Sequence, residues 1–367
     1  MIYLDNAATS FHKPDCVARA VVEAMQQAGN SGRGSSGEAM EASRIIFDTR
    51  CKIAQLFDVE GPECVAFTAN ATEALNTALF GILHPEREKV HAICTEMDHN
   101  SVLRPLYALE KRGMDLTILP ADGKGRISVD DLEVAIRPET KAIVCTHASN
   151  LTGNCNDIRS IGAIARKHGI LFIVDAAQTA GVFPISMKKD QIDILCFSGH
   201  KGLMGPQGTG AICVRPGVLV EPLKVGGSGI LTFQKEHPSD MPESLEAGTL
   251  NSHGIAGLRA SLEWIQETGI HTIRKREQML MWRFYDQVKK IPGVTVYGDF
   301  SQEDRSPVVS LNLEGEGSAE VGMILGEDYG ISVRSGGHCA PLMHKALGTE
   351  KTGAVRFSFS YFNTEEE

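Results

Sequence analysis

The segment Ile192-Asp-Ile-Leu-Cys-Phe-Ser-Gly-His-Lys-Gly202 joins an apolar run to a lysine in a small-residue turn, and a glycine-rich stretch follows to Gly210. Upstream, a second apolar run, Ile170-Leu-Phe-Ile-Val174, leads directly into Asp175. Near-continuous apolar runs of this length predict strands buried on both faces of a parallel sheet. In such sheets the ligand lies beyond the carboxyl ends of the strands, and both Asp175 and Lys201 fall there.

A strand-end lysine and a strand-end aspartate are the pair that pyridoxal phosphate (PLP) needs. The lysine forms a Schiff base with the aldehyde, and the aspartate keeps the pyridine nitrogen protonated so that the ring withdraws electrons from a substrate carbanion. Desolvation of Lys201 at a strand end lowers its pKa and favours the imine. Gln178 follows Asp175 closely enough to donate towards the ring hydroxyl. The alternatives are a surface loop lysine for Lys201 and a helix N-cap for Asp175.

The same alternation of strands and helices runs through the first two thirds of the chain. It predicts an α/β fold with a seven-stranded, mainly parallel sheet between helices. The seven apolar runs are 64–67, 90–94, 116–119, 142–145, 171–174, 194–197 and 210–214. Before them, a helix starting at Pro14-Asp15 carries Val17, Val21, Val22 and Met25 on one stripe. The glycine- and serine-rich stretch 30–37 is compatible with a linker, and a long helix is expected at 38–57.

The pattern changes after about residue 215, where a Gly- and Pro-rich stretch, 226–248, predicts an extended loop. The remaining segments predict a smaller α+β domain. They are helices near 254–268, 271–290 and 317–327, and strands at 294–297, 308–313, 331–334 and 355–359. We expect residues 15–253 to form a large PLP-binding domain, and residues 1–14 with 254–367 to form the small domain.

Composition narrows the possible functions. The 367 residues carry a formal net charge of −10 and no basic run, which argues against a nucleic-acid partner. No apolar run approaches membrane-spanning length and no signal-like start is present, so a cytoplasmic protein without a membrane partner is expected. The nine cysteines include no C-x-x-C pair, which argues against a disulfide framework or a metal site. Thr364-Glu-Glu-Glu367 is typical of a helix start with no helix after it, which suggests a truncated end.

Three further segments follow predicted strands. Thr68-Ala-Asn-Ala-Thr-Glu-Ala-Leu75 opens a helix, and its N–H groups with the Thr72 hydroxyl would cradle a phosphate; a capped helix start is the alternative. His99 follows the next strand and would stack on the pyridine ring and shuttle protons, although a lone histidine is more often a core or surface residue. Asn150 would bond the ring hydroxyl or the substrate.

Cys339 stands out among the cysteines because it lies in a glycine-rich loop, Arg334-Ser-Gly-Gly-His-Cys-Ala-Pro341. The neighbouring His338 would help to generate the thiolate, which is a strong nucleophile towards sulfur. An inert loop cysteine is the alternative. Arg356, on the last predicted strand, is a candidate for a bidentate grip on a substrate carboxylate, and a surface arginine is its alternative.

Together these residues resemble the class V aminotransferase superfamily of fold-type I PLP-dependent transferases, and within it the cysteine desulfurases and selenocysteine lyases. The resemblance covers nearly the whole chain. Its motifs are Tyr3-Leu-Asp-Asn-Ala-Ala8, Ala71-Thr-Glu-Ala74, Val174-Asp-Ala-Ala-Gln178, Ser198-Gly-His-Lys201, Glu246-Ala-Gly-Thr-Leu-Asn251, Arg334-Ser-Gly-Gly-His-Cys339, and Arg356 before Tyr361-Phe-Asn-Thr364.

The resemblance implies a role for each site residue. Lys201, Cys339 and His99 are the catalytic residues, with Lys201 as the internal aldimine and proton carrier and Cys339 as the nucleophile towards the sulfur of bound cysteine. The implied PLP-binding residues are Ala71, Thr72, His99, Asn150, Asp175, Gln178, Ser198, His200, Lys201 and Thr249. Asn150, Arg334 and Arg356 bind the substrate. Thr249 reaches the phosphate of a neighbouring subunit, which implies a homodimer.

The resemblance also implies the reaction: L-cysteine gives L-alanine and a Cys339 persulfide, which passes to an acceptor or scaffold protein such as one for iron–sulfur cluster assembly. The alternatives are a selenocysteine lyase acting on L-selenocysteine, another class V aminotransferase or β-lyase that does not need Cys339, and a scaffold without turnover. Three departures stand out: Gly337 replaces the second His of Arg-x-Gly-His-His-Cys, Gly-Thr-Leu-Asn replaces Gly-Thr-Pro-Asn, and the closing helix is missing.

Overall fold

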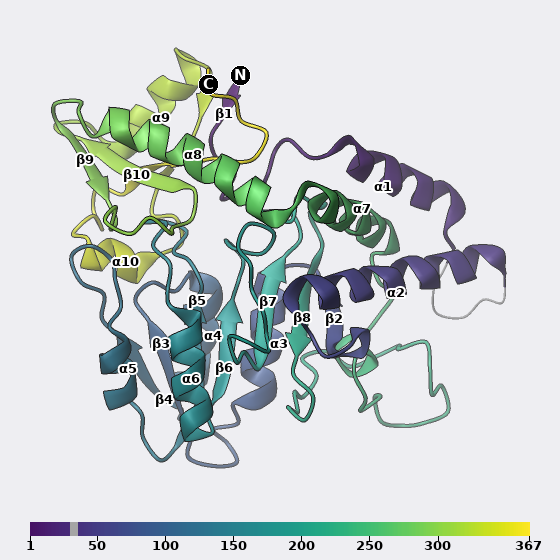
Figure 1. Ribbon diagram of the computed structural model, residues 1–367. Coiled ribbons are helices and arrows are strands. Elements are labelled where there is room, and N and C mark those ends of the chain that lie inside the picture. The colour runs from purple at the N-terminus through teal and green to yellow at the C-terminus, as the bar shows by residue number, and fades with distance from the viewer. Residues whose placement is uncertain (30–35) are drawn as a thin grey trace.

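Seven strands form one sheet in the order β2-β8-β7-β6-β5-β3-β4 in the computed structural model, which describes residues 1–29 and 36–367 (Figure 1). Neighbouring strands pair in parallel except β8, which is antiparallel to both β7 and β2. The predicted seven-stranded, mainly parallel sheet is therefore confirmed. The strands are β2 (Val65–Thr68), β3 (His91–Thr95), β4 (Asp115–Leu119), β5 (Thr140–Thr146), β6 (Leu171–Asp175), β7 (Ile194–Ser198) and β8 (Gly210–Val214).

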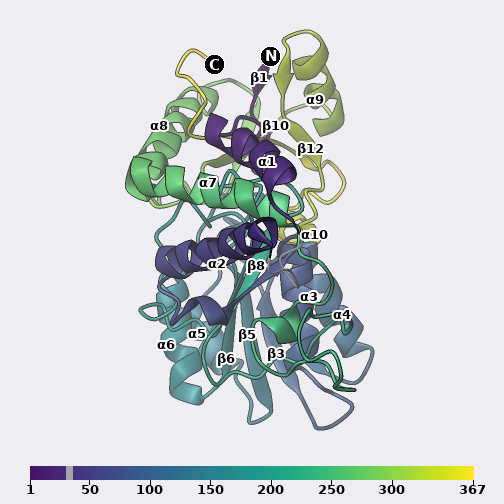
Figure 2. The same ribbon diagram turned by 90° about the vertical axis from the view of Figure 1, so that its right-hand side faces the viewer.

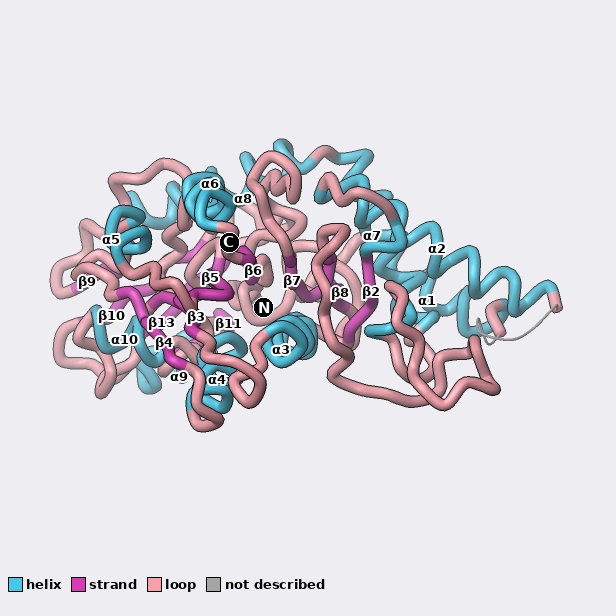
Figure 3. Tube along the Cα trace, turned by 90° about the horizontal axis from the view of Figure 1, so that it is seen from below, coloured by secondary structure: helices cyan, strands magenta, loops and turns pink. Residues whose placement is uncertain are grey.

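Helices cover both faces of this sheet, as the apolar runs require. Along β5, Ile143 and Cys145 belong to one buried cluster and Ala142 and Val144 to another, because successive strand side chains point to opposite faces. Figure 3 shows α5 and α6 on one side of the strands and α3 and α4 on the other. These helices are α3 (Ala71–Ile82), α4 (Asn100–Glu110), α5 (Val129–Val134) and α6 (Ile158–His168).

Four longer helices surround the β2 end of the sheet and the upper part of the molecule (Figure 2). They are α1 (Asp15–Gln27), α2 (Gly37–Phe57), α7 (Ser252–Thr268) and α8 (Ile270–Val288), and α7 packs against α1 and α2. Of the apolar stripe on α1, Val17 is buried, whereas Val22 and Met25 are 52% and 65% exposed. The predicted linker at 30–37 lies almost entirely outside the described residues.

The C-terminal part forms an antiparallel sheet in the order β12-β13-β10-β9, with α9 (Ser318–Glu327) packed on it. Its strands are β9 (Val294–Tyr297), β10 (Val308–Leu313), β12 (Arg334–Gly336) and β13 (Ala354–Ser358). The single strand predicted at 331–334 is wrong. The chain switches sheets at Val333, because β11 (Ile331–Ser332) pairs with β1 (Ile2–Tyr3) and β12 pairs with β13. Short helical segments are α10 (Pro341–Ala346), η1 (Pro62–Cys64) and η2 (Glu243–Leu245).

The chain ends lie close together (Figure 1), and the Asn363 side chain donates to the Tyr3 carbonyl at 3.0 Å. At the last residues Thr364 and Glu367 exchange reciprocal hydrogen bonds of 2.8 and 3.2 Å, which is the bonding of a helix N-terminus. No helix among the described residues is long and apolar enough to cross a membrane.

Candidate active site

The carboxyl ends of β3, β5, β6 and β7 meet at one edge of the large sheet, and the chain leaves each of them through a predicted site residue. Because β2 is parallel to β7 across the reversed β8, the start of α3 lies at this edge too. The small sheet lies over the edge, since Arg356 of β13 donates from Nη1 to the Asn150 carbonyl at 3.0 Å. One edge thus brings together residues from both parts of the chain.

Asp175 and Lys201 are close enough to influence each other's ionisation. Asp175, the last residue of β6, is 2% exposed, and its Oδ1 accepts the Ala177 N–H at 2.9 Å. No helix follows it, so the N-cap alternative is excluded. Burial raises the pKa of Asp175, opposed by the Ala177 N–H and by Lys201. Burial lowers the pKa of Lys201 to about 8, against the opposing pull of Asp175. Lys201 is therefore not a freely solvated surface lysine.

His99 caps α4 through its ring. Its Nδ1 accepts the Ser101 N–H at 3.0 Å, which leaves the proton of the neutral ring on Nε2. Burial, followed by the charge of Lys201, lowers the pKa of His99 to about 4, so the ring is neutral near pH 7. The preceding Asp98 is fully buried, and its carboxylate accepts N–H groups of Thr95 and Thr146 at 2.7 and 2.6 Å. Asp98 thus ties the ends of β3 and β5 together, a role that the sequence pattern did not reveal.

The residues predicted to cradle a phosphate follow two strand ends, those of β2 and β7. Ser198 Oγ, at the end of β7, accepts the Ala71 N–H of the first turn of α3 at 2.9 Å. Thr72 is exposed on the same turn, and the Asn70 side chain caps the helix. A helix N-terminus with an exposed hydroxyl suits an anion. His200 lies nearby in the chain, and burial lowers its pKa to about 4.

The N-terminal segment, residues 4–10, forms hydrogen bonds with Gln178 and His200. Gln178 donates from Nε2 to the Ala7 carbonyl at 3.1 Å, so its side-chain amide is already bonded within the chain. The His200 carbonyl accepts the Ser10 N–H at 3.1 Å, and the His200 ring bonds the Thr9 hydroxyl at 3.0 Å. The opening motif is therefore part of the site wall.

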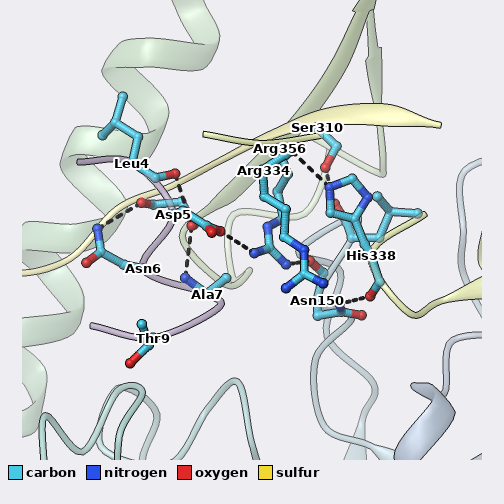
Figure 4. A network of polar contacts seen from close by, with 12 residues as sticks. Leu4, Asp5, Asn6, Ala7, Thr9, Asn150, Ser310, Arg334, His338 and Arg356 are labelled. Carbon is cyan, nitrogen blue, oxygen red and sulfur yellow. Dashed lines mark hydrogen bonds and ion pairs between the residues drawn. The ribbon is translucent and has the colours of Figure 1, made fainter. Parts of the chain in front are cut away.

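Asn150 and Arg356 form a buried polar pair beside this segment (Figure 4). Asn150 donates from Nδ2 to the His338 carbonyl at 2.7 Å, and its Oδ1 is buried without a partner among the described residues. The Arg356 side chain is 1% exposed and its Nη2 bonds Asp5 Oδ1 at 2.5 Å. Arg356 is therefore not a surface arginine, and the carboxylate on it in this structure comes from Asp5.

Cys339 is exposed in the loop between β12 and α10. It lines an open groove of about 510 Å³ with Asn100 and Arg334, and its carbonyl accepts the Asn100 N–H at 2.9 Å, one residue from His99. His338 turns inward: its Nε2 donates to the Arg334 carbonyl at 3.0 Å and its Nδ1 faces His344. Both ring nitrogens are thus engaged away from the thiol, which gives no support to the expectation that His338 generates the thiolate.

Comparisons with known proteins show the family of this chain. The family model described as aminotransferase class-V matches residues 2–367. The chain belongs to the class-V aminotransferase family. It is 34% identical to a probable cysteine desulfurase of Methanothermobacter thermautotrophicus, over all of this chain and 92% of that protein. It is 31% identical to a cysteine desulfurase of Shigella flexneri, over all of this chain and 90% of that protein.

Solved structures give the same result. The apo cysteine desulfurase of Thermococcus onnurineus NA1 superposes with a TM-score of 0.93 at 33% identity, covering all of this chain and 91% of that one. The cysteine desulfurase CsdA of Escherichia coli, in its S-sulfonic acid form, gives 0.86 at 30% identity, covering 99% and 91%. These two solved structures, both cysteine desulfurases, thus share the fold of this chain.

Thr249 lies apart from the rest of the site, whereas Gly337 lines the groove of Cys339. Thr249 is exposed, and it lines a separate cavity of about 690 Å³ with Arg50 and Glu246, so one chain does not bring it to the other predicted phosphate residues. Gly337 has open space around it, since a Cβ built there meets no heavy atom within 4 Å.

Among the described residues no group of three or more His, Cys, Asp and Glu side chains is arranged to hold a metal ion.

Proposed function

We propose that this chain is a PLP-dependent cysteine desulfurase, which converts L-cysteine to L-alanine and leaves a persulfide on Cys339. The observation that carries the proposal is the bond from the Asn100 N–H to the Cys339 carbonyl, which holds the loop of the exposed Cys339 against the residue after His99, at the edge where Asp175 and Lys201 lie. Family membership and relatives at 31–34% identity that are cysteine desulfurases support the same reaction.

The residues at this edge fit PLP. Asp175 is a buried carboxylate with no hydrogen-bonded cation among the described residues, and Asn150 Oδ1 is a buried acceptor that lacks a donor. Lys201 would hold the aldehyde carbon and Asp175 the pyridine N–H. Ala71, Thr72, Ser198 and His200 would hold the phosphate, and His99, Gln178 and Asn150 would lie around the ring. When bound, PLP supplies an electron-withdrawing ring that stabilises negative charge at the substrate α-carbon.

The chain's own groups have distinct tasks in the reaction. Arg356, Arg334 and Asn150 bind and orient the substrate carboxylate. Lys201, whose pKa of about 8 lies near neutrality, takes a proton from the α-carbon as a neutral amine. Neutral His99 offers its Nε2 proton from a fixed ring, because Ser101 holds Nδ1. Enclosure of these groups by the small sheet limits the access of water.

Cys339 carries out the sulfur transfer. Its thiolate attacks the sulfur of the bound cysteine, so an S–S bond forms while the substrate C–S bond breaks, and the electron pair of that bond stays on carbon. The carbon then takes a proton and leaves as alanine. The sulfur is retained as a Cys339 persulfide, which a second thiol must remove by exchange. An iron–sulfur scaffold or a small transfer protein is the proposed acceptor.

The decisive experiment compares the native protein with Cys339→Ser, supplied with L-cysteine and with L-selenocysteine. We expect Cys339→Ser to lose alanine release from cysteine while it keeps its bound PLP. Retention of selenocysteine turnover alone would indicate the second candidate, a selenocysteine lyase. Full cysteine turnover without the thiol would contradict the proposal and indicate another class-V aminotransferase or β-lyase.

We also propose a homodimer that works in the cytoplasm. The exposed Thr249 and a group of exposed apolar side chains support the dimer. These are Val22, Met25, Met40, Phe47, Leu219, Val225 and Phe233, with exposures from 49% to 102%. Nine cysteines, none in a disulfide, suit a reducing compartment. Sedimentation of the PLP-bound protein tests the dimer.

A further inference from the structure

The guanidinium of Arg356 is already paired with a carboxylate from its own chain. Asp5 Oδ1 lies 2.5 Å from Nη2, and Asn150 and Asp5 lie on opposite sides of the group (Figure 4). Arg356 is 1% exposed, whereas the Asp5 side chain is 19% exposed. A buried guanidinium without a counter-ion is costly, so Asp5 neutralises Arg356 when no substrate is present.

Hydrogen bonds to β13 fix the backbone on either side of Asp5. Hydrogen bonds of 2.7 Å from the Ser358 N–H to the Leu4 carbonyl and of 2.9 Å from the Ala7 N–H to Ser358 Oγ hold the segment against β13. Among the described residues, the Asp5 side chain bonds Arg356 alone, and it already touches solvent. Asp5 can therefore release Arg356 by a side-chain rotation into water, without moving the strand.

The Asp5–Arg356 pair leaves guanidinium N–H donors without acceptors. A second carboxylate would accept hydrogen bonds from them. Among the described residues, Arg356 Nε is buried without a partner. Within those same residues, no hydrogen bond or ion pair holds the guanidinium of the half-buried Arg334. The two arginines are close enough for Arg334 to lower the pKa of Arg356 by charge repulsion. A carboxylate that reached both would relieve a repulsion that Asp5, bonded to Arg356 alone, leaves in place.

We infer that Asp5 is a resident counter-ion that the α-carboxylate of the substrate displaces from Arg356, so that Asp5 sets the affinity for substrate. This positioning role rests on the proposed function, in which Arg356 binds that carboxylate. Only the fraction of molecules in which Asp5 has released Arg356 can bind the substrate. The apparent dissociation constant for the substrate therefore rises by the inverse of that fraction. Removal of the Asp5 charge removes this competition.

The test uses the PLP-bound protein and two probes, L-alanine and L-alaninamide, which differ only by the carboxylate. The rise in melting temperature with each probe reports its binding. In Asp5→Asn we expect L-alanine to bind about tenfold tighter than in the native protein, a difference of about 1.4 kcal/mol, with L-alaninamide unchanged. The KM for L-cysteine should fall in parallel. Asp5→Glu restores the charge and should restore affinity close to the native value.

Glu246→Gln is the matched control, because it also removes a carboxylate from a buried arginine, Arg50, but in the separate cavity. It should lower the melting temperature without changing the L-alanine response. If Asp5→Asn does not fold alone, L-alanine but not L-alaninamide should restore its folding. Equal or weaker L-alanine binding by Asp5→Asn, or no rescue, overturns the inference. A native protein that binds both probes equally instead contradicts the proposed role of Arg356.

Discussion

Asn100 donates its backbone N–H to the carbonyl oxygen of Cys339 at 2.9 Å, and this bond joins the thiol-bearing loop to the first turn of α4. His338 and Cys339 both adopt left-handed backbone angles, with φ of 50° and 55°. Such angles are uncommon for residues other than glycine and persist where surrounding contacts impose them. The main chain at Cys339 is therefore held in place, while its side chain is exposed.

Gly337→His is expected to activate the Cys339 thiol. The position has room for a side chain, so stability should change by less than about 0.5 kcal/mol. An imidazole beside a thiol lowers the pKa of the thiol, and His338 is turned away from it. Alkylation of Cys339 at pH 7, followed on the Cys339 peptide by mass spectrometry, should accelerate severalfold. Gly337→Gln is the uncharged control, and an equal acceleration in it would contradict the explanation.

Glu246→Gln should destabilise the chain strongly. Glu246 forms two bonds to Arg50, of 2.7 and 2.6 Å, and accepts the Phe67 N–H at 2.6 Å, with both side chains of the ion pair buried. Loss of one partner leaves a buried unpaired charge, which costs about 3–5 kcal/mol. Urea unfolding measures this loss. Glu221→Gln, which breaks the exposed pair with Arg87, should cost less than about 1 kcal/mol.

The large sheet was predictable because its strands are buried on both faces and are therefore apolar throughout. The small sheet was less so. Its outer strands β9 and β12 are partly exposed, and the chain changes sheets within the four residues from Ile331 to Arg334. A local pattern does not indicate which partner strand a two-residue segment will join, because β1 lies more than three hundred residues away. The exposed Val22 and Met25 likewise follow from what packs on α1, which periodicity cannot show.

For the site, the place of Asp175 at the end of a buried strand was predictable from the apolar run before it. The polar partners were not, because they are distant in sequence. Asp5 and Arg356 are separated by 351 positions, and Asp98 bonds Thr146 across 48. Asp5 stood within the quoted opening motif, and Arg356 was a candidate to bind a substrate carboxylate. Predicting that Asp5 pairs with Arg356 required knowing that the N-terminal segment runs along β13.

Asp98→Asn should lower both stability and turnover. The two carboxylate oxygens of Asp98 accept the backbone N–H groups of Thr95 and Thr146, and an amide NH₂ cannot replace an acceptor. One unsatisfied buried N–H costs about 1–3 kcal/mol. Because the next residue is His99, a displaced ring should reduce kcat by about tenfold to a hundredfold. Stopped-flow alanine release and thermal unfolding provide the two measurements.

Thr95→Val is the milder control for Asp98. It removes the 2.9 Å bond from the Thr95 hydroxyl to Asp98 but keeps both backbone donors. It should cost about 1 kcal/mol, with kcat close to native. If Asp98→Asn and Thr95→Val had equal effects on kcat, the carboxylate would not be what positions His99.

Glu277→Gln should stabilise the protein increasingly as the pH rises. Glu277 is 2% exposed on α8; its Oε1 accepts the Tyr361 N–H at 3.0 Å, and its Oε2 is buried without a partner among the described residues. Burial raises the pKa of Glu277 from the ordinary glutamate value of about 4.5 to about 8. The folded chain therefore holds a proton that the unfolded chain has lost between these values, so stability falls with pH in that window, at up to about 1.4 kcal/mol per pH unit.

Glutamine keeps the shape of Glu277 but has no proton to lose. The difference in unfolding free energy between Glu277→Gln and native protein should be small at pH 4.5 and grow steadily to pH 8, then level off. Urea unfolding at half-unit steps of pH measures it. Asp286→Asn, on the same helix but exposed beside Lys289, should show no such growth. A difference independent of pH would mean that the Glu277 carboxyl has the same pKa in the folded and unfolded states, which contradicts the raised pKa of the buried group.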